Sequence, residues 1–216
     1  MSQLLLDGKY LWEKHSRYLW CIDPGHGGEG PNGYTTAPAK MFKHDTFTIY
    51  EGVINRGIAN KLIDMLQGGR IDYAVVADDI EDTSLSHRVT TADNVFKKDK
   101  RAIYLAIHSN SGGGSGFELF TSPGQTKSDK IANIFCDSYA KHFPEFKFRA
   151  DRSDGDADKE ADFYVLRKTD CPAILVENLF FDNKKEAEFL LSEEGQTRIA
   201  KCLYDAIMMC EQLKPI

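Results

Sequence analysis

Two histidines and a glutamate follow apolar runs of the chain at comparable positions. They are His108 directly after the run 102–107, Glu177 directly after 173–176, and His26 four residues after 18–22. A second glutamate, Glu51, opens a segment with helical spacing. Parallel strands bring their carboxyl ends to one edge of a sheet, where open α/β sheets bind ligands. We therefore expect His26, Glu51, His108 and Glu177 to lie close together.

These residue types suggest metal-assisted hydrolysis. Two imidazoles and one carboxylate form a three-ligand zinc set that leaves a fourth position open for water. A remaining carboxylate can move the proton that such a reaction requires. The residues alone do not say which glutamate is the ligand and which is the proton carrier.

The elements that must position these side chains form an α/β pattern. Three of the four runs 18–22, 71–77, 102–107 and 173–176 are almost continuously apolar, which is typical of strands buried on both faces. Apolar residues recur at helical spacing in three segments, namely 54–66, 131–143 and 199–213. The segment 116–122 alternates and suggests an added strand near an edge. We predict one domain with a mostly parallel twisted sheet, helices on both faces and the site at the carboxyl ends of the strands.

Composition narrows the function classes. The chain has 216 residues, of which 42% are hydrophobic, enough for the core of one domain. With 27 Lys and Arg against 33 Asp and Glu, the net charge of -6 argues against nucleic-acid binding. No apolar stretch approaches the ~18 residues of a membrane span. The cysteine count of five, with no CxxC pair, favours buried thiols in a reducing compartment over disulfides.

A nucleotide-binding alternative fits poorly. Residues 25–30 match G-x-G-x-x-G after a strand, but that motif requires a helix to begin at its glycines. Pro31, Gly33 and Pro38 follow instead, and helical spacing begins only near Glu51.

Other polar candidates favour structural roles. We expect Arg88 to form an ion pair, Cys171 to be a buried thiol, and His15 and His142 to lie at the surface. The segment 29–50 is expected to be a long loop forming one wall of a cleft. His44 in that loop is a further candidate for a ligand or an acid/base group.

Ordered motifs between residues 18 and 212 resemble the zinc-dependent N-acetylmuramoyl-L-alanine amidases of the Amidase_3 type, found in bacterial cell-wall enzymes and phage endolysins. The matching stretches are IDPGHGG at 22–28, Glu51 with VINRGIANKL at 53–62, SLSHRVTTA at 84–92 with Asn94, IHSN at 107–110, Phe117-Glu118, and VLRKTDCPAILVEN at 165–178. One such motif would be weak evidence, but their common order makes the resemblance specific.

The resemblance implies roles for the four residues. The family's ligands for one Zn²⁺ per chain fall on His26, Glu51 and His108, and its catalytic glutamate falls on Glu177. The implied reaction hydrolyses the amide between N-acetylmuramic acid and L-alanine in peptidoglycan. Glu118 also matches a family position, but we assign it no catalytic role, since alternation could face it to solvent.

Two departures from the family pattern concern substrate contacts. Leu179 stands where the family usually has glycine after its catalytic Glu-x pair, and the usual arginine near the end of the second strand is missing from 76–79. Two alternative functions stay open. One is a zinc peptidase cutting within the stem peptide, and the other is a non-catalytic wall-binding module.

The expected organisation is an N-terminal extension at 1–17 and a catalytic domain at 18–216. The start of the chain has no signal-peptide pattern. We therefore expect a monomeric phage lysis enzyme, made in the cytoplasm without stable membrane association. It would reach the cell wall through a pore-former.

Overall fold

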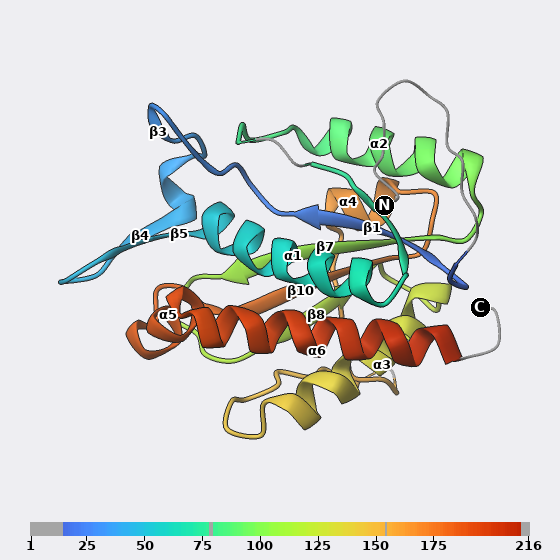
Figure 1. Ribbon diagram of the computed structural model, residues 1–216. Coiled ribbons are helices and arrows are strands. Elements are labelled where there is room, and N and C mark those ends of the chain that lie inside the picture. Colours follow the sequence, from blue (N-terminus) through green and yellow to red (C-terminus); the bar gives the residue numbers. More distant parts are fainter. Residues whose placement is uncertain (1–14, 78–79, 154, 213–216) are drawn as a thin grey trace.

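A six-stranded sheet forms the centre of the computed structural model, which describes residues 15–77, 80–153 and 155–212 (Figure 1). The strand order is β6-β1-β7-β10-β8-β9. The first four of these strands are mutually parallel, β8 is antiparallel to β10, and β9 is parallel to β8. The bounds are β1 Leu19–Pro24, β6 Asp72–Val75, β7 Ala102–Asn110, β8 Glu118–Thr121, β9 Lys159–Glu160 and β10 Ala173–Phe180.

Helices cover both faces of this sheet (Figure 1). On one face lie α1 Glu51–Gly68, α3 Lys127–His142, α5 Lys184–Leu191 and α6 Glu193–Gln212. On the other lie α2 Leu85–Lys98 and α4 Tyr164–Lys168. No helix among the described residues is long and apolar enough to cross a membrane. The predicted fold class is confirmed.

Side-chain alternation explains the unbroken apolar runs. In β7, Ile103, Leu105 and Ile107 pack in the core beneath α1 and α6, whereas Tyr104 and Ala106 pack toward α2 and α4. Since successive side chains of a strand point to opposite faces, a strand covered on both sides must be apolar throughout. β8 begins at Glu118, so the alternating segment is a strand next to the short edge strand β9, as expected.

The segment 29–50 was wrongly predicted to be a long loop. It forms two small hairpins, β2 Glu29–Gly30 with β3 Gly33–Tyr34 and β4 Met41–Lys43 with β5 Thr48–Tyr50, joined through the 3-10 turn η1 Pro38–Lys40. Strands of two or three residues are too short for their alternation to be recognised in the sequence.

The prediction that the cysteines are buried thiols is confirmed, since all five are free and buried. Of the expected N-terminal extension, residues 1–14 lie outside the described part of the chain, so its boundary stays a prediction. Residues 78–79, the second half of the stretch 76–79 from which the family's usual arginine is missing, also lie outside it.

Candidate metal centre

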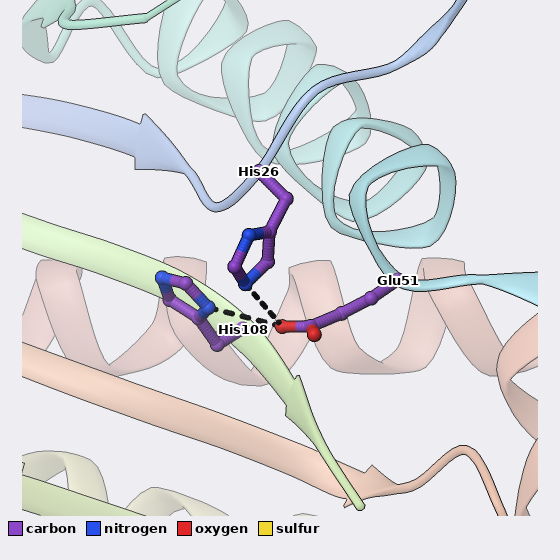
Figure 2. A group of neighbouring side chains, drawn as sticks. All are labelled: His26, Glu51 and His108. Atoms are coloured by element: carbon purple, nitrogen blue, oxygen red, sulfur yellow. Dashed lines mark hydrogen bonds and ion pairs between the residues drawn. The ribbon is translucent and has the colours of Figure 1, made fainter. Parts of the chain in front are cut away.

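Three separate elements bring His26, Glu51 and His108 together (Figure 2). His26 follows β1, Glu51 is the first residue of α1, and His108 lies within β7. Glu51 Oε1 is 3.3 Å from His26 Nε2 and 3.0 Å from His108 Nδ1. One ligand atom from each residue lies within 4.8 Å of the others, and no other such group of three occurs in the described residues.

The donor set fits a zinc ion. His26 Nε2 and Glu51 Oε2 are both buried without a hydrogen-bond partner, although Lys40 Nζ lies 3.5 Å from Glu51 Oε2. A buried polar atom left without a partner is costly, and a cation would relieve that cost. Burial alone would raise the pKa of Glu51, but the interactions of its carboxylate with the His108 and His26 imidazoles outweigh burial and lower the pKa. A carboxylate that stays ionised beside two imidazoles is a suitable ligand set for zinc.

Two arginines hold the loop that contains His26. Arg88 of α2 forms a buried ion pair with Asp23, as expected, and also donates to the backbone oxygens of Pro24 (3.0 Å) and His26 (3.2 Å). Arg56 of α1 donates to the His26 oxygen at 2.6 Å. These bonds fix His26, whose φ of 63° is unusual for a residue with a side chain.

Glycines around the cluster are required by close approach. A Cβ on Gly25 would lie 2.2 Å from the His108 ring, and one on Gly52 would lie 1.8 Å from the Gly27 oxygen. The glycine-rich stretch therefore lets the imidazole and α1 pack against the backbone. No helix begins at these glycines, since the hairpin of β2 and β3 follows them. The nucleotide-binding alternative therefore lacks the helix that it requires.

Glu177 lies directly opposite His108 in the pairing of β10 with β7. Both strands continue past their apolar runs, so these side chains lie within the strands rather than after them. The Glu177 Oε2 atom is buried without a hydrogen-bond partner. Burial raises the pKa of Glu177 to about 8, although the charge of His108 opposes this. A carboxyl group with such a pKa can take up and release a proton near neutral pH.

Supporting residues around the cluster were not identified from the sequence. Asn55 donates to the Gly25 oxygen (3.2 Å) and accepts from Ser109 Oγ (3.2 Å). Asn178 donates to the His108 oxygen at 2.9 Å. Asn55 is four residues after Glu51, so helical spacing places both on one face of α1, which was an available signal.

The remaining candidates do not join the cluster. His44 Nε2 lies 2.9 Å from the Phe181 oxygen, so His44 serves the fold. Burial raises the pKa of Cys171 to about 12, in agreement with an inert thiol. His142 is half-buried and lies 3.0 Å from Asp205. Glu118 is buried, so its expected exposure to solvent was wrong.

The chain is similar to known cell-wall amidases. It is 32% identical over 180 residues to the N-acetylmuramoyl-L-alanine amidase CwlM of Bacillus licheniformis, covering 83% of this chain and 63% of that protein. It is 25% identical over 191 residues to the endolysin of Bacillus phage SPP1, covering 86% of this chain and 63% of that protein. The chain thus spans less than two thirds of either relative's length.

A solved structure and a family model agree with these relatives. The crystal structure of the N-acetylmuramoyl-L-alanine amidase from Clostridium difficile 630 matches with a TM-score of 0.76 and 25% identity, over 93% of this chain and 100% of that one. The family model described as N-acetylmuramoyl-L-alanine amidase matches residues 21–209. The chain belongs to the N-acetylmuramoyl-L-alanine amidase family.

Proposed function

We propose that the chain is a zinc-dependent amidase that hydrolyses the bond between N-acetylmuramic acid and L-alanine in peptidoglycan. The observation that supports it most is the convergence of His26, Glu51 and His108, with buried atoms that lack partners, beside Glu177. Family membership supports the choice of substrate bond.

Each residue of the site has a separate role in this proposal. His26, Glu51 and His108 would hold one Zn²⁺ per chain. When bound, zinc supplies Lewis acidity that polarises a carbonyl and lowers the pKa of water. Glu177 would take the proton of the attacking water and later deliver it to the leaving amine. Its raised pKa of about 8 suits both transfers.

Product identification tests this function. Purified peptidoglycan is digested with the chain, with and without a chelator, and the products are analysed by mass spectrometry. We expect glycan with free lactyl groups and intact stem peptides beginning with L-alanine, and no release in the chelator. Shortened stem peptides would indicate a peptidase instead. Wall binding without any release would indicate a non-catalytic module.

We further infer a role in phage lysis, as a monomer made in the cytoplasm and released through a pore-former. The similarity to a phage endolysin and the five free, buried cysteines support this role. Expression of the chain alone should leave cells intact, and co-expression with a pore-former should lyse them. Lysis without a pore-former would contradict this inference.

A further inference from the structure

A row of polar side chains continues from the metal centre across the sheet. His108 of β7 pairs with Glu177 of β10, and Glu177 pairs with Glu118 of β8. Residues directly opposite each other in neighbouring strands point to the same face of a sheet. Beyond Glu118, Phe120 of β8 pairs with Lys159 of β9. The row therefore leads from the metal ligands to the β9 edge of the sheet.

A cleft of about 470 Å³ lies at the end of this row. Its lining contains four cationic side chains and no carboxylate. The lining residues are Lys147, Phe148, Arg149, Ala150, Arg152 and Lys159. In a chain with a net charge of -6, a concave surface whose only charged lining residues are cations is a marked local excess of positive charge. Such a cleft attracts anions and raises their local concentration.

Glu118 fixes two of these cations in place. Its Oε1 atom accepts from Arg149 Nε at 2.7 Å and also from Lys159 Nζ, and Asn110 Nδ2 donates to its Oε2 at 2.5 Å. Burial alone would raise the pKa of Glu118, but the two cations outweigh burial and lower it. Since Glu118 forms hydrogen bonds to Arg149 and Lys159 but not to Lys147 or Arg152 among the described contacts, the latter two remain available for an external anion.

The distance to the cleft suggests which part of a substrate reaches it. Neighbouring strands are about 4.8 Å apart, so Glu118 lies about 10 Å from His108 across β10. An extended peptide advances about 3.5 Å per residue, so this distance corresponds to about three residues. The cleft lies one strand further, at β9 and about 14 Å from β7, so a stem peptide leaving the site along the row would bring its third and fourth residues to the cleft. Guanidinium groups bind carboxylates well because the two geometries match.

We propose that the cleft binds carboxylate groups of the stem peptide, within the first four residues after the scissile amide. This inference rests on the proposed amidase function. It makes Lys147 and Arg152 specificity-determining residues that distinguish stem peptides with free carboxylates from those with carboxamides. Both side chains belong to exposed residues and lie outside the metal centre.

The test uses the zinc-loaded full chain and two soluble muropeptides. One has free stem-peptide carboxylates, and the other has the same carboxylates converted to carboxamides. The variant Lys147→Gln/Arg152→Gln removes two charges from the cleft. The matched control Arg70→Gln/Lys97→Gln removes the same charges from exposed residues, after α1 and near the end of α2.

We expect the cleft variant to lose roughly fivefold in kcat/KM on the free-carboxylate substrate, mainly through KM, because exposed ion pairs contribute modestly. Its activity on the carboxamide substrate should stay unchanged, and the control should behave as wild type on both. The wild-type KM for the free-carboxylate substrate should also rise with salt more steeply than the variant's.

Three results would overturn the inference. The first is an equal loss of kcat/KM by the cleft variant on both substrates, and the second is no loss on either substrate. The third is the same loss of kcat/KM in the control variant. Inhibition of wild type by a phosphate-rich wall polymer, with no preference between the two muropeptides, would instead assign the cleft to that polymer and also overturn it. If the wild-type protein releases no peptide with an N-terminal L-alanine from either substrate, the proposed function itself is wrong.

Discussion

The two glutamates of the site have pKa values shifted in opposite directions. The pKa of Glu51 is lowered because the two imidazoles outweigh the effect of burial. The pKa of Glu177 is raised to about 8 because burial dominates. When environments separate the pKa values of two carboxyl groups, one is suited to remain an anion and the other to exchange a proton. Their surroundings thus favour Glu51 as the ligand and Glu177 as the proton carrier.

This division of roles predicts different behaviour for two variants. Glu177→Gln keeps the size of the side chain but removes its basicity, so zinc content and fold should persist. Turnover should fall by about 10²–10⁴-fold, the usual contribution of a positioned base. His108→Ala removes a ligand, so zinc content should fall together with activity. Atomic absorption and hydrolysis on the same preparations measure both, and equal zinc loss in the two variants would contradict the assignment.

Asp158 offers a prediction on pH and stability. It is buried, its Oδ2 accepts from Thr121 Oγ1 at 2.7 Å, and Asp156 lies beside it. Burial and the Asp156 carboxylate raise the pKa of Asp158 to about 7 from an ordinary 3.8. A raised pKa in the folded state means that folding favours the protonated form of Asp158. The contribution of this group to stability is therefore present near pH 4 and is lost as the pH rises through 7.

Asp158→Asn should therefore stabilise the fold at pH 8 by at least about 1 kcal/mol, and this advantage should vanish toward pH 4. The amide retains an acceptor for Thr121 and can donate to Asp156. Urea denaturation at several pH values measures the free energy of unfolding of the wild-type protein and of the variant. The exposed Asp137→Asn serves as the control and should show no such trend. A pH-independent difference for Asp158→Asn would refute the explanation.

At the scale of elements, β10 explains the departure from the family pattern at Leu179. The pairing of β10 with β7 shifts register between Glu177 and Phe180, and Leu179 adopts a φ of 61°. This left-handed conformation favours glycine and costs other residues about 1–2 kcal/mol. Leu179 is nevertheless fully buried in the core. Its packing offsets the backbone strain.

Two variants separate strain from packing at this position. Leu179→Ala should destabilise the fold by about 2–5 kcal/mol through the lost packing. Leu179→Gly loses more side chain but relieves the strain, so it should be at least as stable as the alanine variant. In α1, the equally buried Leu62 should show the opposite order, with Leu62→Gly about 1 kcal/mol less stable than Leu62→Ala. Denaturant unfolding of all four variants tests this, and the same order at both positions would contradict the role of the backbone.

The sequence predicted elements best where burial controls the pattern. The long apolar strands and amphipathic helices were located because a core imposes unbroken or periodic hydrophobicity over many residues. The hairpins within 29–50 were missed because their strands are too short. The contact of Arg56 with the His26 oxygen could not be predicted, because helical spacing does not indicate where a long side chain extends. The positions of His26, His108 and Glu177 could be predicted because parallel strands bring their ends to one edge of the sheet. Glu51 opens a helix, and its expected role as a ligand came from the family resemblance.

At the scale of the whole molecule, the proposed metal ligands come from three distant parts of the chain. His26, Glu51 and His108 meet only after β1, α1 and β7 have packed together. The unfolded chain therefore has no comparable site, and metal binding should stabilise the folded state specifically.

Zinc should consequently raise the melting temperature of metal-free protein. At a free zinc concentration of about 100 times the Kd, binding stabilises the folded state by about 2.7 kcal/mol. For a domain of this size, each kcal/mol of stabilisation raises Tm by about 2–4 °C. We expect a rise of about 5–10 °C at pH 7.5 by differential scanning calorimetry. Because protons compete with the metal for imidazole, the rise should shrink toward pH 5. His26→Ala and His108→Ala should show little rise, whereas Glu177→Gln should respond as wild type. A full rise in His108→Ala would mean that zinc binds elsewhere on the chain.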